Sequence, residues 1–215
     1  MPFLMLRFRY KYKETLAVRQ AYHLFTLIFF MMKLRLTHFF LFVTLLSFGQ
    51  TTLKFNGVTA LAGIPNIGVE TSIGNKMTFQ LDATASFWES FDGAPLQFFL
   101  VTPEVRYHFN EKFNGFYVGA NISFALFKLQ KYGYSNTNNY QKGFSFFFGP
   151  TIGYQWKLNE KWGLDAFVGG GHQEANYKLY DLDTNQRIDT WYKGYNRSGE
   201  WIPYRGGLMI TYKIK

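Results

Sequence analysis

The sequence predicts an all-β fold: an eight-stranded antiparallel up-and-down transmembrane β-barrel with short periplasmic turns and longer external loops. Three observations predict it. Aromatic residues are abundant, with 25 Phe, 15 Tyr and 5 Trp among 215 residues, and such residues favour strands. Apolar and polar residues alternate with a period of two through most of the chain. The connections between these segments are short and long in turn, which is typical of outer-membrane barrels.

Residues 1–49 lie outside the predicted barrel. Residues 32–49 have the features of a secretory signal peptide, because Lys33 and Arg35 precede an apolar run at 39–48 and a small-x-small cleavage site lies before Gln50. The apolar run is shorter than a transmembrane helix requires. Residues 1–31 are interpreted as an over-long gene start, and an N-terminal extension with an uncleaved helix is the alternative. Residues 50–215 are predicted to form one domain, the barrel.

Eight segments of the mature chain are predicted to be strands. The clearest lies at 144–158, where Phe144, Phe146 and Phe148 alternate with Ser145 and Gly149. The first segment alternates least clearly. In chain order, the predicted strands cover residues 53–61, 67–73, 77–87, 99–109, 116–126, 144–158, a segment that begins at 162, and 202–214.

The connections between the strands are also predicted from turn residues. With both termini on one side of the barrel, every short connection lies on that side and every longer one lies opposite. Aromatic residues near the short turns, namely Tyr107, Phe109, Phe113, Trp156, Trp162 and Tyr212, are expected to form an interfacial girdle. The short connections fall at 74–75, 110–112 and 159–161, and the longer ones at 62–65, 89–96, 128–142 and 178–200.

The apolar face of the strands is predicted to contact lipid, and the polar face to line the lumen. In the last strand, for example, Ile202 and Tyr204 belong to the lipid-facing set and Arg205 to the lumen set. A soluble barrel is the alternative, but its interior would require apolar side chains, and the polar face here holds many charges. If the polar face lines the lumen, its positive and negative side chains can pair with one another across the lumen. We expect a lumen polar network of Glu70, Asp82, Glu104, Arg106, Asp165 and Arg205, with Lys54, Lys157 and Lys213 on the same face.

Composition excludes several classes of function. The chain has no cysteine, so it contains no disulfide, no thiolate metal site and no cysteine nucleophile. Its net charge of +9 is carried mostly by residues 1–49. Because the remainder is only weakly basic and has no Lys/Arg stripe that suits phosphate binding along a nucleic acid, we expect no nucleic-acid partner.

Four stretches of the chain resemble a known family. PNIGVE (65–70), PEVRYHF (103–109), FNGFYVG (113–119) and GYQWKLNEKWGLDAFVG (153–169) are similar to an uncharacterised family of outer-membrane barrels, the domain-of-unknown-function 3575 family. The resemblance covers residues 53–214 and implies a barrel fold and an outer-membrane location. Its motifs are strand and turn patterns, so it implies no catalytic residue. The chain departs from barrel patterns at Lys215, because barrel chains commonly end on an aromatic residue.

Few residues suggest catalytic or metal chemistry. His108 lies on the lumen face near a periplasmic turn and is interpreted as a hydrogen-bonded polar residue. His172 and Glu174 lie on the outward face near the external rim, where some barrel enzymes that trim lipid A place a His, a Ser and a carboxylate. No serine accompanies them at a comparable spacing, so a lipid-modifying enzyme is the least favoured alternative. The sequence predicts no catalytic residue, no cofactor and no metal.

The external loops suggest a recognition function. Tyr132, Tyr134, Trp191, Tyr192 and Tyr195 lie on loops held by a rigid barrel, and such residues are typical of binding surfaces. We therefore expect a monomeric barrel in the outer membrane of a Gram-negative bacterium, in contact with outer-membrane lipid and with an unknown surface protein or ligand. The alternative is a channel for small apolar solutes, suggested by the lumen-side residues Tyr117, Phe127, Phe147 and Phe167.

Overall fold

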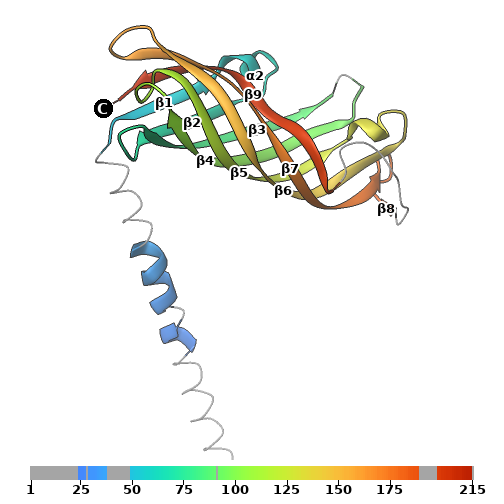
Figure 1. Ribbon diagram of the computed structural model, residues 1–215. Coiled ribbons are helices and arrows are strands. Elements are labelled where there is room, and N and C mark those ends of the chain that lie inside the picture. The colour runs from blue at the N-terminus through green and yellow to red at the C-terminus, as the bar shows by residue number, and fades with distance from the viewer. Residues whose placement is uncertain (1–23, 28, 38–48, 91, 189–197, 215) are drawn as a thin grey trace, which may run out of the picture. The chain divides into compact units, whose positions relative to one another are not determined.

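The computed structural model describes residues 24–27, 29–37, 49–90, 92–188 and 198–214 (Figure 1). The chain divides into two units, Met1–Phe48 and Gly49–Lys215. In the first unit, residues 24–27 and 29–37 are helical. Among the described residues, no helix has both the length and the apolar character needed to cross a membrane. The second unit contains all of the strands.

The strands of the second unit are short at its start and long in its second half. β1 and β2 contain 6 and 7 residues, whereas β6 and β7 contain 19 and 20. The elements in chain order are β1 (Thr51–Asn56), α2 (Gly57–Leu61), β2 (Asn66–Ser72), β3 (Met77–Glu89), β4 (Pro95–His108), β5 (Gly115–Leu129), η1 (Tyr132–Tyr134), β6 (Asn139–Lys157), β7 (Trp162–Asp181), β8 (Arg187–Ile188) and β9 (Glu200–Lys213).

The sheet closes into a barrel because its first and last strands pair. β1 pairs with β2 on one side and with β9 on the other, and both pairings are antiparallel. The remaining wall strands pair with their sequence neighbours. The two-residue β8 forms a short hairpin with the end of β7 and is not a strand of the wall. In the wall, β9 therefore pairs directly with β7. The wall therefore has eight strands in up-and-down order, which confirms the predicted fold class (Figure 1).

The first predicted strand was too long. It was expected to cover 53–61, but β1 ends at Asn56 and the next five residues form the helix α2. The cause is local: the Asn56 side chain accepts hydrogen bonds from the backbone N–H groups of Val58 and Thr59, at 3.2 and 3.4 Å. This is an N-cap, and it competes with continued strand pairing.

The barrel has two different ends. The turn end holds the two chain ends of the barrel unit and the short connections at 73–76, 109–114 and 158–161. The loop end holds α2 and the connections at 90–94, 130–138 and 182–199. The predicted loops at 128–142 and 178–200 were too long, because β5, β6, β7 and β8 extend into them. Since β6 and β7 are longest, the wall extends furthest at the loop end on their side (Figure 1).

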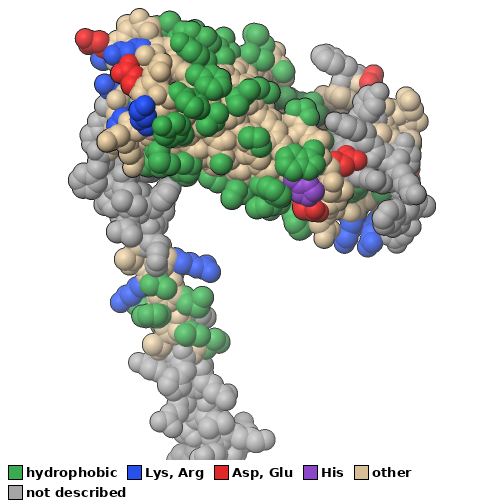
Figure 2. Space-filling view, in the orientation of Figure 1, with side chains coloured by type: hydrophobic (Ala, Val, Ile, Leu, Met, Phe, Trp, Pro, Cys, Tyr) green, Lys and Arg blue, Asp and Glu red, His purple; other side chains and the backbone are tan. Residues whose placement is uncertain are grey.

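Burial alternates along the wall strands. In β5, for example, Asn121 and Ser123 are buried, whereas Phe116, Ile122 and Phe124 are exposed. Apolar side chains consequently spread over the outside of the barrel (Figure 2). The polar side chains that a water-soluble barrel would place outside lie in the lumen instead.

A β-bulge in β9 corrects the predicted orientation of two side chains. Gly169 of β7 pairs with Arg205, but Gly170 pairs with Pro203, so Tyr204 is an extra residue without a partner on β7. The bulge reverses the alternation beyond it. Ile202, predicted to contact lipid, is buried at 8% exposure, and the Tyr204 hydroxyl bonds to the lumen residue Asn121.

Candidate functional site

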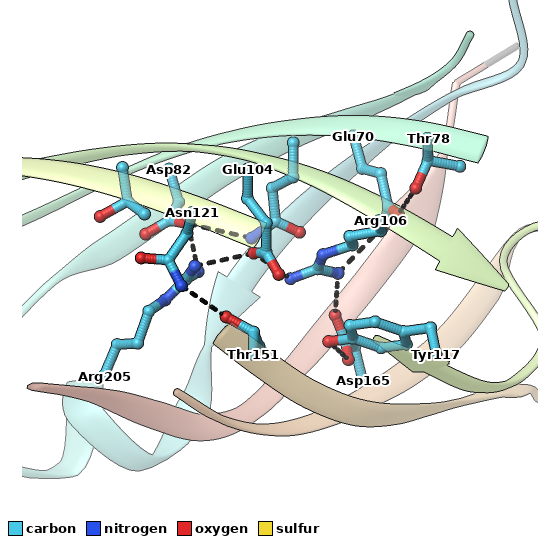
Figure 3. A network of polar contacts seen from close by, with 12 residues as sticks. Glu70, Thr78, Asp82, Glu104, Arg106, Tyr117, Asn121, Thr151, Asp165 and Arg205 are labelled. Carbon is cyan, nitrogen blue, oxygen red and sulfur yellow. Dashed lines mark hydrogen bonds and ion pairs between the residues drawn. The ribbon is translucent and has the colours of Figure 1, made fainter. Parts of the chain in front are cut away.

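The lumen near the turn end is crossed by buried ion pairs (Figure 3). Arg106 lies at their centre, with Nη1 2.8 Å from Asp165 Oδ2 and Nη2 3.0 Å from Glu104 Oε2. Lys54 pairs with the same Asp165 oxygen, with Nζ 2.6 Å from Oδ2, and also pairs with Glu70. The side chains of these five residues have no exposed surface.

Arg205 extends the ion pairs toward the loop end. Its Nη1 lies 2.7 Å from Glu104 Oε2, and its Nη2 lies 2.7 Å from Asp82 Oδ2. Glu104 thus accepts from two guanidinium groups, and the pairs form one connected system (Figure 3). We call it the lumen network; it consists of Lys54, Glu70, Asp82, Glu104, Arg106, Asp165 and Arg205.

The members of the lumen network come from six different wall strands: β1, β2, β3, β4, β7 and β9. Each side chain points inward because it lies on the polar face of its strand. The network therefore joins strands that are not neighbours in the sheet. All six residues of the predicted polar network lie in it, together with Lys54 from the same predicted face.

Neutral side chains also donate to carboxylates of the lumen network. Tyr117 Oη donates to Asp165 Oδ1 at 2.8 Å, and the Arg106 guanidinium lies 4.4 Å from the centre of the same ring. Gln155 Nε2 donates to Glu70 Oε2 at 2.8 Å. The sequence indicated Tyr117 only as an apolar lumen residue, because the partner of its hydroxyl is 48 residues away along the chain.

His108 has the polar environment that was expected for it. Its Nε2 lies 3.0 Å from the Thr78 hydroxyl and 3.5 Å from Glu70 Oε1, and the side chain is fully buried. Two other residues of the predicted lumen face differ from expectation. Lys157 and Lys213 are exposed at the turn end, because they lie at the ends of β6 and β9.

Beyond Arg205, toward the loop end, the lumen contains an apolar cluster as well as buried polar residues such as Ser145 and Gln173. Leu100, Ala125, Phe147 and Ile202 pack together there, with Phe98 and Tyr204 against them. We call these six residues the upper-lumen cluster. The rings of Phe147 and Tyr204 lie 4.6 Å apart, centre to centre. The other two apolar lumen residues singled out in the sequence, Phe127 and Phe167, are also buried, but neither belongs to this cluster.

A buried lysine lies nearest the loop end. Lys131 is only 4% exposed, and its Nζ lies 4.3 Å from the ring centre of Tyr177 and 5.2 Å from that of Phe127. Burial lowers the pKa of Lys131 to about 8, and the charge of Glu200 opposes this shift. From turn end to loop end, the lumen thus contains the lumen network, the upper-lumen cluster and Lys131.

The predicted recognition residues are only partly described. Tyr134 is buried, at 5% exposure. Trp191, Tyr192 and Tyr195, and the side chain of Tyr132, lie outside the described residues. Their role stays a prediction.

His172 and Glu174 lie on the outer surface of β7. His172 Nε2 is 2.8 Å from Glu174 Oε1, and Ser198 Oγ donates to Glu174 Oε2 at 2.7 Å. The sequence missed Ser198, because it is 24 residues from Glu174. The serine bonds to the carboxylate and not to the histidine, so this arrangement differs from a nucleophile–histidine–acid relay. The described residues contain no group of His, Asp and Glu side chains able to hold a metal ion.

Comparison with known proteins gives a family and matches among solved structures. A family model described as a protein of unknown function, DUF3575, matches residues 30–214. No curated protein matches the chain. The NMR solution structure of the E. coli outer membrane protein W is 11% identical, with a TM-score of 0.42, and the match covers 77% of this chain and 98% of that one. The chain, with its closed antiparallel barrel and charged lumen, belongs to the DUF3575 family.

Proposed function

We propose that this protein is a non-conducting, monomeric barrel of the outer membrane of a Gram-negative bacterium, which presents its loop end for recognition of a surface protein or ligand. The observation that carries the proposal is the lumen network. It links six strands across the lumen with ion pairs whose side chains are at most 4% exposed. A lumen filled in this way favours an anchoring role over solute transport.

The outer surface supports placement in a membrane. Large apolar residues are exposed around the barrel, among them Phe124, Phe144 and Phe146 at 43–46% (Figure 2). A closed barrel satisfies its backbone hydrogen bonds within the wall, which a membrane core requires. Near the turn end, the rings of Trp162 and Tyr212 lie 4.8 Å apart, as in an interfacial aromatic girdle. Export through a cleaved signal peptide is part of the same proposal.

The recognition surface is proposed for the loop end near β6 and β7, where the wall extends furthest. Asn138 Nδ2 donates to Asp181 and Asp183 at 3.2 and 2.8 Å, and Tyr140 Oη donates to Asn185 at 2.9 Å. These bonds join the connection at 130–138 and the start of β6 to the end of β7 and the residues that follow it. Binding residues commonly lie on loops that a rigid scaffold holds in position, and these bonds can hold the loops in that way.

The proposal is tested by replacing Trp191, Tyr192 and Tyr195 together with Ala. We expect assembly and heat-modifiable migration to be unchanged, while binding of surface partners cross-linked on whole cells falls by about thirtyfold, because aromatic loop residues carry most binding energy. Asn136→Ala, an exposed change in the neighbouring loop, is the control. A triple variant that binds and attaches like wild type would contradict the recognition function.

A channel for small apolar solutes is the second candidate, and the upper-lumen cluster favours it. Phe147 and Ile202 belong to an apolar cluster in the loop-end half of the lumen, which also holds buried polar residues such as Ser145 and Gln173. A solute would still meet the lumen network below. If this function is correct, uptake of a labelled apolar solute changes in Phe147→Ala and tolerates the loop substitutions.

A further inference from the structure

Three lysines lie side by side on the outer face of the barrel. In the strand register, Lys128 of β5 is opposite Lys142 of β6, and Lys142 is opposite Lys178 of β7. All three lie on the outward-facing side of their strands, as Leu126 and Phe144 do in the row below. Lys142 and Lys178 are exposed and Lys128 is half-buried. We call Lys128, Lys142 and Lys178 the lysine row.

The lysine row has an electrostatic cost that the described residues do not offset. Like charges directly opposite each other on neighbouring strands destabilise a sheet. Among the described residues, neither Lys142 nor Lys178 forms an ion pair, and Lys128 Nζ lies 5.0 Å from the ring centre of Tyr140. The acid nearest along the outer face of β7 is Glu174, whose two oxygens already bind His172 and Ser198. The row therefore suits an external anion.

On β5 and β6 the rows below the lysines are apolar, whereas on β7 Asn176 lies opposite Phe144 and Glu174 lies opposite Phe146. Leu126 and Phe144 form the next row down, and Phe124 and Phe146 the one after it. These side chains are 43–52% exposed, and the rings of Phe124 and Phe144 stack at 6.2 Å. In Figure 2 the broad apolar band is followed, toward the loop end, by a His side chain and by both acidic and basic side chains.

A cationic row directly above an apolar band fits an anionic amphiphile. Neighbouring strands lie about 4.8 Å apart, so the row spans roughly 10 Å, more than a single phosphate covers. The ammonium groups suit phosphate, and the aromatic rows suit acyl chains. We propose that the lysine row binds the phosphate groups of a membrane lipid whose acyl chains pack on the aromatic rows beneath. The inference rests on the membrane placement in the proposed function but not on recognition by the loops.

The experiment measures binding of diphosphorylated lipid A to the full-length barrel refolded in detergent micelles. Lys128→Gln/Lys142→Gln/Lys178→Gln is the test variant. Lys157→Gln/Lys161→Gln/Lys213→Gln is the control, because it removes the same charge from exposed lysines at the turn end. We expect the test variant to lose at least about tenfold in affinity and the control less than about twofold. Replacing the same three lysines with Arg should keep most of the binding.

Several results would overturn the inference. An equal loss of lipid A affinity in the two triple Gln variants would indicate general attraction between a basic protein and an anionic lipid. Equal binding of dephosphorylated lipid would exclude phosphate recognition, and equally tight binding of inorganic phosphate would exclude a lipid site. A folded barrel that inserts into lipid vesicles but binds no lipid A contradicts this inference alone. A barrel that does not insert contradicts the membrane placement and this inference together.

Discussion

Arg205 balances the charge of buried carboxylates in the lumen. It is the cation closest to Asp82, and it also pairs with Glu104. Asp82 Oδ2 additionally accepts from Gln80 Nε2 at 3.0 Å, and its Oδ1 accepts from Asn66 at 3.2 Å. These neutral donors hold the carboxylate in place but do not balance its charge. A buried charge without its partner is expensive, whereas a neutral replacement pair is tolerated.

We therefore predict that Arg205→Met destabilises the folded barrel by about 3–5 kcal/mol. The double variant Arg205→Met/Asp82→Asn should recover at least about 1 kcal/mol, because the neutral amide that replaces the carboxylate leaves no unpaired charge there. Urea unfolding of the refolded barrel in lipid vesicles, followed by Trp fluorescence, measures both. A double variant less stable than the single one would show that charge balance does not govern this position.

Lys131 provides a prediction for pH. Its pKa is lowered to about 8 in the fold by burial, below the ordinary value of 10.5. Between these values the unfolded chain binds more protons than the folded one, so Lys131 makes stability rise with pH, by at most about 1.4 kcal/mol per unit. The difference in unfolding free energy between wild type and Lys131→Met should therefore shift in favour of wild type from pH 8 to 10. A constant difference over that range would rule out a buried, titrating Lys131.

The orientation of most lumen residues could be predicted from the sequence, because alternation with period two assigns each residue to a face. Glu70, Glu104 and Asp165 lie where this rule places them. Tyr204 does not, because one extra residue in β9 reverses the rule beyond Arg205. Nothing in the local sequence sets the register of β9 against β7, so the bulge could not be predicted.

At the scale of elements, backbone hydrogen bonds decide where strands end. β1 stops at Asn56 because that side chain caps α2, although residues 57–61 look extended by composition. β6 and β7 continue past their predicted ends, since each supplies the partner for the other as far as Asn139 and Asp181. Pairing partners far apart in sequence thus determine strand length more than local residue preference does.

The β6–β7 pair depends on glycine where the two strands approach each other closely. Their ladder is interrupted between the pairs Phe148–His172 and Thr151–Gly169, and a Cβ on Gly171 would collide with the backbone of Phe148 and Gly149. Gly171→Ala should therefore destabilise the barrel by about 1–3 kcal/mol and reduce its heat-modifiable form. Gly57→Ala, where a Cβ would lie 3.7 Å from the nearest atom, should have little effect. Equal stability of the two variants would contradict the close approach.

At the scale of the whole molecule, two patterns in the sequence predict the barrel. Apolar and polar residues alternate along each strand, and short and long connections alternate between the strands. The candidate sites were less predictable, because they join residues that are distant in sequence. Ser198 reaches Glu174 only through the return of β9 beside β7. The lysine row exists only because three strands pair in one register.

We propose that the lumen network makes the barrel non-conducting. Single-channel recording of the refolded full-length protein in a planar lipid bilayer tests it most directly. We expect no stable openings from wild type, because the ion pairs around Arg106 cross the lumen and leave it filled. Regular, long-lived openings of uniform conductance from the wild-type barrel would contradict the account.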